Sequence, residues 1–328
     1  MQSNKLPLVL LTHALPKNWI TMLEGNCNYS SGDVDSIQWE PGLKALLPEA
    51  EGILSLLTIP VSKEILAQAP NLRVVSNMAV GVDNIDVNAC TIRGIPVGNT
   101  PGVLTESTAD LTMALLLSIA RNIPQASLDA RKGLWKTWAP AGWLGIDLSG
   151  ATLGIIGMGK IGQAVAKRAQ GFGMTILFID IERKTFPNAF QVNLDELLAR
   201  SDIVTLHAPL LPETRGLINN YAFSLMKPTT ILINAARGQL VDTNALVTAL
   251  REKKISAAAL DVTDPEPLPP DHPLYTFSNC LIVPHIGSAT QHTRRLMAEL
   301  ACKNLLAGLR GEQIPHCVNP EVYLHDKE

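Results

Sequence analysis

Three glycines near the middle of the chain constrain its fold more than any other feature. Gly157, Gly159 and Gly162 have the spacing G-x-G-x-x-G and directly follow a short apolar run, Thr152–Ile156. An apolar run of this length before glycines is typical of a buried strand. The first glycine then permits a tight turn, the second lets backbone amides approach a pyrophosphate, and the third lets a helix pack close to the strand. The alternative is a glycine-rich turn in an ordinary α/β protein.

The residues that follow favour dinucleotide binding. Apolar residues recur every four positions from Ile161, as on one face of a helix. The N-terminus of that helix, which carries the positive end of its dipole, would face the phosphates. A second apolar run, Thr175–Ile179, ends at Asp180, where an acid is expected to bind a ribose 2′-hydroxyl.

Composition narrows the class of protein. A chain of 328 residues, 46% of them hydrophobic, can bury a large core and is expected to form two domains. A net charge of −3 without a basic run argues against a nucleic-acid partner. No stretch approaches ~18 apolar residues, so we expect no transmembrane helix. Five scattered cysteines without a C-x-x-C pair favour reduced thiols and a cytoplasmic location, and no cluster has metal-ligand spacing, so no metal is expected.

The first hundred residues predict a small α/β domain ahead of the dinucleotide fold. Short apolar runs, expected to be parallel strands, lie at Leu6–Leu11, Gly52–Leu57, Leu72–Val75 and Ile95–Gly98. Helices are expected between them, at Ser62–Gln68 and Ile85–Arg93. The segment Met78–Asp86 follows a strand, and its amides either form an anion-binding nest for a carboxylate or belong to a simple turn.

A long apolar helix and a tryptophan-rich loop lie between the two predicted domains. The helix begins at Thr105 and is apolar at nearly every position from Leu111 to Ala120, so we expect it to be buried on several sides. The loop, Gly133–Gly150, holds three of the five tryptophans. A long loop with aromatic side chains predicts a subunit contact; alternatively, the rings cover the core of their own chain.

Polar residues follow the later strands of the predicted second domain. These strands are expected at Ile203–Leu206, Thr230–Asn234, Ala257–Leu260 and Leu281–Val283. Ligands of doubly wound sheets bind beyond the carboxyl ends of the strands. The polar residues found there are His207, Arg237, Asp261, Glu266, His285 and Ser288.

Five motifs accompany the dinucleotide stretch: NTPGVLTESTAD (99–110), HAPLLPETRGLI (207–218), INAARGQLVD (233–242), LDVTDPEP (260–267) and VPHIGSAT (283–290). With them the chain resembles the D-2-hydroxyacid dehydrogenases over nearly its whole length, and within that family it is most similar to the glyoxylate/hydroxypyruvate reductases. The resemblance implies an α/β fold of two Rossmann-like domains. A doubly wound parallel sheet would form the cofactor domain, residues 101–287, and residues 1–100 and 288–328 would form a smaller, flavodoxin-like substrate domain.

Three residues suit the reduction of a 2-oxoacid by hydride transfer. The planar fork of Arg237 matches carboxylate and carbonyl oxygens. His285 suits protonation of the developing alkoxide, and Glu266 suits stabilisation of the protonated imidazole. The motifs of the family imply the same three roles. Taken singly, each residue has a simpler interpretation: a surface cap, a strand-end histidine and a solvated loop acid.

The resemblance also implies contacts to cofactor and substrate. The implied cofactor-binding residues are Thr105, Gly157, Gly159, Lys160, Ile161, Gly162, Asp180, His207, Pro209, Thr214, Ala235, Asp261 and His285. Asp261 would contact the nicotinamide amide, and His207 is either structural or cofactor-lining. The implied substrate-binding residues are Leu56, Val80, Gly81, Arg237, His285 and Ser288, with Arg294 nearby. The amides of Val80 and Gly81 would hold the carboxylate, and the relatives further imply a homodimer, with Trp138 reaching the partner's active site.

Two positions narrow the substrate. Leu56 stands where phosphoglycerate dehydrogenases tend to have arginine, and Val80 where phosphite dehydrogenases tend to have lysine. We therefore expect NAD(P)H-dependent reduction of glyoxylate or hydroxypyruvate to the D-2-hydroxyacid. The first alternative is a phosphite dehydrogenase. The second is an NAD(H)-sensing corepressor of the same family, although such proteins carry long extensions that this sequence does not show.

The residues after the second strand predict the preferred cofactor. The carboxylate of Asp180 would repel the 2′-phosphate of NADP, and neither Ile181 nor Glu182 offers that phosphate a favourable contact. Arg183 and Lys184 either turn toward the phosphate or form a solvated turn, and we favour the solvated turn. We therefore expect NADH to be preferred, with some activity with NADPH.

Overall fold

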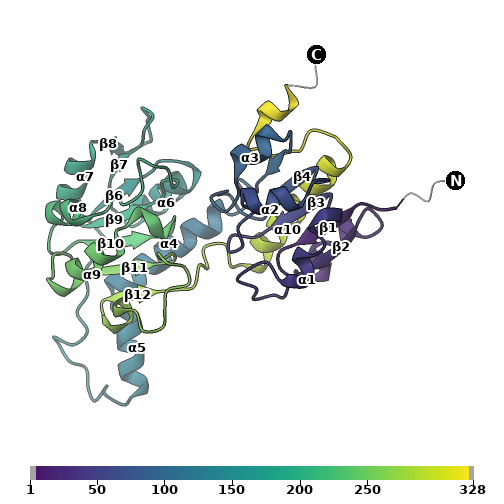
Figure 1. Cartoon of the computed structure of the whole chain (residues 1–328). Helices are drawn as coiled ribbons and strands as arrows, with labels where there is room; N and C mark the ends of the chain where they lie inside the picture. Colours follow the sequence, from purple (N-terminus) through teal and green to yellow (C-terminus); the bar gives the residue numbers. More distant parts are fainter. Residues whose placement is uncertain (1–4, 325–328) are drawn as a thin grey trace. The chain divides into compact units, whose positions relative to one another are not determined.

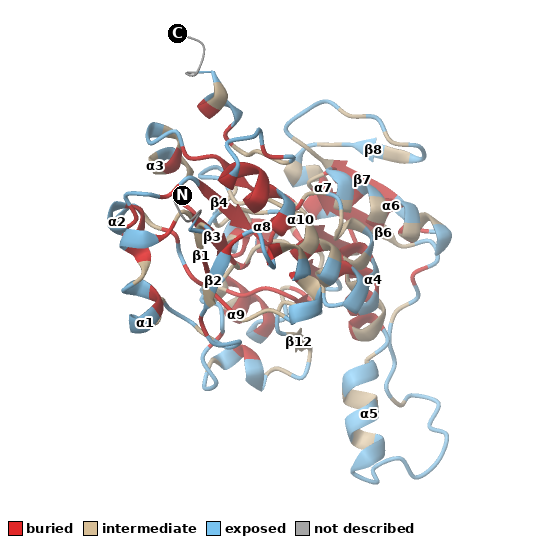
Figure 2. Cartoon of the chain, turned by 90° about the vertical axis from the view of Figure 1, so that its right-hand side faces the viewer, coloured by how far each residue is buried: buried red, intermediate tan, exposed pale blue. Residues whose placement is uncertain are grey.

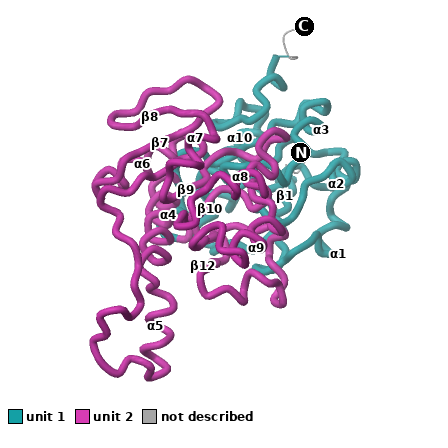
Figure 3. The backbone as a smooth tube through the Cα atoms, turned by 90° about the vertical axis from the view of Figure 1, so that its left-hand side faces the viewer, with its two compact units in different colours: residues 1–104, 290–328 teal, residues 105–289 magenta. Residues whose placement is uncertain are grey.

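The computed structural model describes residues 5–324 and divides into two compact units. The first unit comprises the chain up to Leu104 together with the segment from Thr290 onward, and the second is Thr105–Ala289 (Figure 1; Figure 3). Each unit is built around one parallel sheet that has a hydrophobic core on each face. The predicted α/β class is confirmed.

Within the described residues, the sheet of the first unit has five strands in the order β2-β1-β3-β4-β5, the order typical of flavodoxin-like folds. Its strands are β1 (Leu8–Leu11), β2 (Asn28–Ser31), β3 (Gly52–Ser55), β4 (Val74–Asn77) and β5 (Val97–Gly98). Its α-helices are α1 (Pro41–Lys44), α2 (Lys63–Gln68), α3 (Val87–Ile92) and α10 (Gln291–Leu309). The late helix α10 thus belongs to the same unit as the first strands.

Successive side chains of these strands enter opposite cores. Val9 of β1 packs with Leu305 of α10 on one face of the sheet. Leu10, the next residue, packs on the other face with Ile65 of α2 and Cys90 of α3. This period of two is that of strands covered by helices on both sides.

The sheet of the second unit has seven strands within residues 5–324, in the order β12-β11-β10-β9-β6-β7-β8. Its strands are β6 (Thr152–Ile156), β7 (Thr175–Ile179), β8 (Ala189–Gln191), β9 (Ile203–Leu206), β10 (Ile231–Asn234), β11 (Ala257–Leu260) and β12 (Cys280–Ile282). Its α-helices are α4 (Thr105–Ala120), α5 (Ile123–Arg131), α6 (Lys160–Gly171), α7 (Leu194–Arg200), α8 (Asn220–Leu225) and α9 (Thr243–Arg251). None of the helices in the described part of the chain is both long and apolar enough to cross a membrane.

Helices cover both faces of this second sheet. Phe178 of β7 is fully buried on the face that carries α4 and α6. Its neighbour Leu177 is buried on the opposite face, with residues of α7, α8 and α9. Buried inner strands of this sheet, such as β7, are accordingly drawn mostly in red in Figure 2, whereas the edge strand β8 is not. The sheet is a doubly wound, Rossmann-type sheet, as predicted.

Two short strands at sheet edges are not predicted by the sequence. β2 is the polar run N-Y-S-S, and most of its residues are exposed. β8 has only three residues and lies at the outer edge of the second sheet. Neither has the apolar run that identifies the inner strands, because an edge strand has less surface to bury.

Helix α5 and the loop after it consist mostly of exposed and intermediate residues (Figure 2). The exposed apolar residues among them include Ile123, Leu128 and Leu134. Trp135 is 66% exposed and Trp138 is 83% exposed. Trp143 is less exposed, and its Nε1 donates a hydrogen bond to Oδ2 of Asp129 at 2.9 Å. Trp135 and Trp138 therefore do not cover the core of their own unit, which was the alternative interpretation of this loop.

Candidate active site

The candidate site lies at the carboxyl edge of the second sheet. All strands of this sheet are parallel, so the segments that follow them leave at one edge. The strand order reverses between β6 and β9, and such a switch point is where doubly wound sheets bind ligands. The glycine loop follows β6, and His207 follows β9.

The three glycines of the loop have different surroundings. Gly157 has φ +96°, and a Cβ there would lie 2.6 Å from the backbone nitrogen of Ala208. A Cβ on Gly162 would lie 2.2 Å from the carbonyl oxygen of Gly157, so α6 packs against the turn only with glycine there. Around a Cβ on Gly159 nothing lies within 4 Å. A side chain would therefore collide with the protein at Gly157 and Gly162, whereas Gly159 has room for one.

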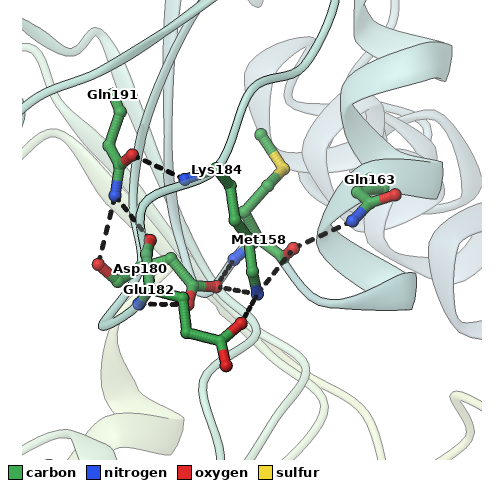
Figure 4. A network of polar contacts seen from close by, with 6 residues as sticks. All are labelled: Met158, Gln163, Asp180, Glu182, Lys184 and Gln191. Atoms are coloured by element: carbon green, nitrogen blue, oxygen red, sulfur yellow. Dashed lines mark hydrogen bonds and ion pairs between the residues drawn. The ribbon is translucent and has the colours of Figure 1, made fainter.

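Asp180, at the end of β7, contacts the glycine loop directly (Figure 4). Its Oδ2 accepts hydrogen bonds from the amide of Met158 at 2.8 Å and from Nζ of Lys184 at 2.9 Å. Its Oδ1 accepts from the amide of Glu182 at 3.1 Å. Burial alone would raise the pKa of Asp180, but these three hydrogen bonds outweigh it and lower the pKa below its ordinary value. The carboxylate is therefore ionised at neutral pH and holds the loop.

The sequence analysis favours Lys184 as part of a solvated turn. The structure shows that this prediction is wrong, because the side chain is paired with a carboxylate. Its ammonium pairs with Asp180, and that hydrogen bond raises the pKa of Lys184. The side chain of Gln191 fixes the turn by accepting from the amide of Lys184 at 3.0 Å and donating to the carbonyl of Glu182 at 2.9 Å (Figure 4). A cation thus offsets the carboxylate that was expected to repel a 2′-phosphate. Gln191 lies on the unpredicted strand β8, so sequence reasoning missed it.

His207 lies beside the glycine loop in a neutral form. Its amide donates to the carbonyl of Ile156 at 2.7 Å, and its Nε2 lies 2.9 Å from Oγ1 of Thr205. Burial lowers the pKa of His207 to about 4. Its Nδ1 is buried and has no hydrogen-bond partner among the described residues. An uncharged imidazole adds no positive charge for the phosphates of a cofactor.

Thr214 holds the segment that follows His207. Its Oγ1 donates to the carbonyl of Pro209 at 2.7 Å and accepts from the amide of Leu211 at 2.8 Å. This closed turn contains both Pro209 and Thr214, the two residues of the segment that we predict to bind cofactor.

The turn that carries Arg237 is shaped by Asn234, a residue that the sequence analysis does not single out. Asn234 ends β10 and is buried; its Nδ2 donates to the carbonyl of Arg237 at 2.8 Å, and its Oδ1 accepts from the amide of Ala236 at 3.1 Å. An asparagine at a strand end that bonds to the next residues is a known turn former and was the available signal. Beyond the turn, a Cβ on Gly238 would lie 1.9 Å from the carbonyl oxygen of Thr263. Only glycine fits there, and it brings the Arg237 turn against the segment that leads to Glu266.

Glu266 and His285 form a hydrogen-bonded pair. Oε1 of Glu266 lies 2.6 Å from Nδ1 of His285, and its Oε2 accepts from the amide of Thr263 at 3.3 Å. Burial alone would raise the pKa of Glu266; the contact with His285, the Thr263 amide and the charge of Arg237 together lower the pKa below its ordinary value. An ionised carboxylate only accepts hydrogen bonds, so Nδ1 of His285 is the donor. The opposite ring nitrogen, Nε2, is left for a ligand.

Asp261 holds the turn on which His285 sits. The amide of His285 donates to the carbonyl of Asp261 at 2.9 Å, and the carboxylate of Asp261 accepts from the amides of Ile286 at 2.6 Å and Gly287 at 2.9 Å. His285 has φ 51°, a left-handed backbone conformation that non-glycine residues seldom adopt. Burial raises the pKa of Asp261, which is 2% exposed, although the two amide hydrogen bonds oppose the shift. The predicted contact of Asp261 with the nicotinamide thus stays a prediction, beside a structural role that the sequence did not reveal.

The predicted substrate residues of the first unit follow neighbouring strands. Leu56 follows β3, and Val80 and Gly81 follow β4. Nδ2 of Asn84 donates to the carbonyl of Leu56 at 3.0 Å, and Nδ2 of Asn77 donates to the carbonyl of Gly81 at 2.8 Å. One network thus joins the two segments. Of the remaining predicted residues, Thr105 begins α4, Ser288 follows the His285 turn and Arg294 lies in α10.

The residues of the second unit fit a dinucleotide. The loop is open over Gly159, and no side chain caps the start of α6, so the amides at this helix end can face a pyrophosphate. Asp180 follows the next strand, as required for a ribose contact. In residues 5–324, no group of three or more His, Cys, Asp or Glu side chains is arranged to hold a metal ion.

Known proteins resemble the chain in sequence and structure. The family profile described as "D-isomer specific 2-hydroxyacid dehydrogenase, NAD binding domain" matches residues 113–287. A glyoxylate reductase of Thermofilum pendens is 45% identical, over 96% of this chain and 95% of its own length. A crystal structure of a Thermus thermophilus protein has a TM-score of 0.90 and 47% identity, covering 95% of this chain and 99% of its own.

A third relative has bound ligands. It is an NADPH-dependent glyoxylate/hydroxypyruvate reductase of Sinorhizobium meliloti, solved with NADP and malonate, with a TM-score of 0.85 and 30% identity over 96% of this chain and 98% of its own. The family profile covers more than half of the chain, and the relatives cover nearly all of it. The chain belongs to the D-isomer-specific 2-hydroxyacid dehydrogenases and is an enzyme of that family.

Proposed function

We propose that this enzyme reduces a small 2-oxoacid, glyoxylate or hydroxypyruvate, to the D-2-hydroxyacid. The observation that carries the proposal is the pair formed by Nδ1 of His285 and Oε1 of Glu266, 2.6 Å apart. Such a pair at the carboxyl edge of a dinucleotide-type sheet suits an acid that works next to a nicotinamide. The names of relatives from Thermofilum pendens and Sinorhizobium meliloti support the substrate class.

In the proposed reaction, each of the three residues His285, Glu266 and Arg237 has a separate role. The reduced cofactor supplies a hydride for the carbonyl carbon of the 2-oxoacid. His285 gives the proton on Nε2 to the carbonyl oxygen, so the product is the alcohol. Glu266 stays ionised and accepts the hydrogen on Nδ1, which orients the ring and offsets its charge. Arg237 binds carboxylate and carbonyl oxygens through its two-pronged guanidinium and stabilises the negative charge that develops.

In the proposed function, residues of the first unit bind the carboxylate of the substrate and limit its size. The amides of Val80 and Gly81 hold the carboxylate, and Leu56 offers an apolar surface to the C3 substituent. A leucine cannot neutralise a phosphate, so the proposed substrate is a small 2-oxoacid without a charged C3 substituent. Ser288 completes the proposed set of contacts.

For the cofactor we propose a preference for NADH with residual use of NADPH. Asp180 is ionised and follows β7, the strand end at which a carboxylate that accepts from ribose hydroxyls is expected. Lys184 is paired with it and weakens its repulsion of a 2′-phosphate. The name of the Sinorhizobium meliloti relative records NADPH dependence, so the preference is argued from these two residues and not from the family.

We also propose that the enzyme is a homodimer that uses the loop after α5 as part of its subunit contact. Trp135, Trp138 and Leu144 expose 66%, 83% and 68% of their surface, respectively. Large aromatic side chains that are exposed together favour a protein interface.

Oxidation of NADH in the presence of a panel of 2-oxoacids tests the proposed activity. Glyoxylate and hydroxypyruvate should be reduced faster than pyruvate or a phosphorylated 2-oxoacid, and the product of hydroxypyruvate should be the D-isomer. Binding of NADH without turnover of any 2-oxoacid would favour the NAD(H)-sensing alternative. Reduction of NAD by phosphite would favour the phosphite dehydrogenase.

A further inference from the structure

Three consecutive carbonyl groups after β4 each accept a hydrogen bond, two from the segment that follows β5 and one from Asn77 at the end of β4. The carbonyl of Ala79 accepts from the amide of Thr100, that of Val80 from Nδ2 of Asn99, and that of Gly81 from Nδ2 of Asn77. Each of these three hydrogen bonds is 2.8 Å long.

These bonds determine where the amide groups point. In a planar trans peptide the C=O of one residue and the N–H of the next point in opposite directions. The amides of Val80, Gly81 and Val82 are therefore turned away from the groups that hold the carbonyls. Among residues 5–324 none of these three amides donates a hydrogen bond to the protein. Successive free amides in a turn form an anion-binding nest.

Asn77 can occupy only one orientation. It is fully buried; its Oδ1 accepts from Oγ of Ser55 at 2.9 Å and Nδ2 of Asn84 at 3.4 Å, and its Nδ2 donates to Gly81 and to Oδ1 of Asn84 at 3.0 Å. All of its hydrogen-bonding positions are used, and a carbonyl only accepts, so the amide nitrogen must face Gly81. Asn84 extends the network to Leu56 by donating to its carbonyl at 3.0 Å.

Asn99 is held independently of Asn77. Its own carbonyl accepts from Nδ2 of the buried Asn304 at 2.9 Å, and its amide donates to the carbonyl of His316 at 3.2 Å. Asn304 and His316 belong to the C-terminal segment of the first unit. Two separate networks therefore converge on adjacent peptide groups, Val80 and Gly81.

We propose that Asn77 and Asn99 are positioning residues that set the affinity of the enzyme for the carboxylate of its substrate. They act by holding the carbonyls of Gly81 and Val80, so that the amides of Val80, Gly81 and Val82 face the carboxylate as a preformed nest. The inference rests on the proposed function, in which Val80 and Gly81 bind the substrate carboxylate, and adds the residues that orient them.

Two variants test the proposal. Asn77→Asp is nearly isosteric, but an ionised carboxylate cannot donate to Gly81 and repels its carbonyl. Asn99→Ala removes the other donor at a half-buried position and keeps the test open if Asn77→Asp does not fold. The matched control is Asn71→Ala, because Nδ2 of Asn71 also donates to a carbonyl at 2.8 Å, that of Pro48, in the same unit.

The measurements are steady-state kinetics with glyoxylate, calorimetric binding of oxamate to the enzyme–NADH complex, and calorimetric binding of NADH alone. Oxamate is a carboxylate that cannot be reduced, so its binding needs no turnover. Both variants should weaken oxamate binding and raise KM for glyoxylate by about 10-fold or more, the scale of a lost hydrogen bond to a charged group. Changes in kcat should be smaller, NADH affinity should be unchanged, and Asn71→Ala should behave like the wild type.

The outcomes separate this proposal from the proposed function. Variants that bind oxamate as tightly as the wild type, or that lose oxamate and NADH affinity equally, would overturn the positioning role. A wild type that binds oxamate but reduces no 2-oxoacid would overturn the proposed function alone, and the comparison of oxamate affinities would still decide the role of the asparagines. A wild type that binds NADH but neither binds oxamate nor reduces a 2-oxoacid would overturn both.

Discussion

Nδ1 of His285 lies 2.6 Å from Oε1 of Glu266, while the backbone of His285 is held separately by Asp261. The ring and the backbone of the proposed acid are thus fixed by two different carboxylate residues on one chain segment. The two carboxylates differ in environment: the pKa of Glu266 is lowered and that of Asp261 is raised. This difference is expected because Glu266 accepts from the ring of His285 and lies near the charge of Arg237, whereas burial dominates at Asp261.

Glu266→Gln should lower kcat/KM for glyoxylate by about 10- to 100-fold, part of the ~10²–10⁴ that general acid catalysis supplies. The glutamine can still accept from Nδ1 of His285 but cannot offset the charge of a protonated ring. NADH affinity, measured by fluorescence, should be unchanged. Activity equal to that of the wild type would show that the charge of Glu266 is not used.

The stability of the wild type relative to Glu266→Gln should depend on pH. Because the pKa of Glu266 is lowered in the folded chain, its ionised form stabilises the fold above the unfolded value of about 4.3. That contribution is lost as the pH falls through the lower, folded value. The difference in Tm between wild type and Glu266→Gln should therefore be largest above about pH 5 and shrink as the pH falls below the unfolded value. A difference in Tm that does not change with pH would contradict a lowered pKa of Glu266 in the folded chain.

Arg237→Lys should lower kcat/KM for glyoxylate by about 10²-fold, the scale of a lost donor to a developing oxyanion. An ammonium keeps the charge but cannot reproduce the paired contacts of a guanidinium with carboxylate and carbonyl. Arg251→Lys, an exposed arginine at the end of α9, is the matched control and should be neutral. If Arg237→Lys retained most activity, charge alone would account for the role of Arg237.

Substitutions of Asp180 and Lys184 should change kcat/KM with NADPH in opposite directions. Asp180→Ala removes the charge that repels a 2′-phosphate and leaves Lys184 with only its longer ion pair to Glu182, so kcat/KM with NADPH should rise about 10-fold, or ~1.4 kcal/mol. Lys184→Gln leaves Asp180 unpaired and should lower NADPH use by a similar factor with little change for NADH. Arg183→Gln, on the same turn, is the control. A wild type that prefers NADPH would contradict the proposed role of Asp180.

Light scattering should show that the wild type has twice the mass of one chain. Trp138→Ser should weaken the dimer by at least about 10-fold in Kd, because an exposed tryptophan is a frequent interface hot spot. Phe190→Ser replaces an aromatic residue that is 62% exposed on β8 and should leave the dimer intact. A fully active monomeric wild type would remove the dimer proposal.

The sequence predicts the inner strands of both sheets well, because a covered strand must be apolar on both faces. The predicted runs at Thr152–Ile156, Thr175–Ile179, Ile203–Leu206 and Ala257–Leu260 are strands with those bounds. The edge strands β2 and β8 escape prediction, since exposed side chains on an edge carry no such pattern.

The candidate site is predicted less completely than the sheet that carries it. Residue type and position at a strand end indicate Glu266 and His285, and the structure places them within hydrogen-bond distance. The residues that hold the site, Asn77, Asn234 and Gln191, are not predicted. The hydrogen bonds through which they hold the neighbouring turns reach residues at most nine positions away. The residue type at the end of a strand does not reveal, however, which carbonyl or amide the side chain will contact.

The most direct test of the account is kcat/KM for glyoxylate in His285→Ala, measured with the affinity of the same variant for NADH. We predict that kcat/KM falls by at least ~10²-fold while NADH binds as in the wild type, because the acid is lost and the glycine loop is intact. Turnover close to that of the wild type would contradict the role of His285 as the proton donor.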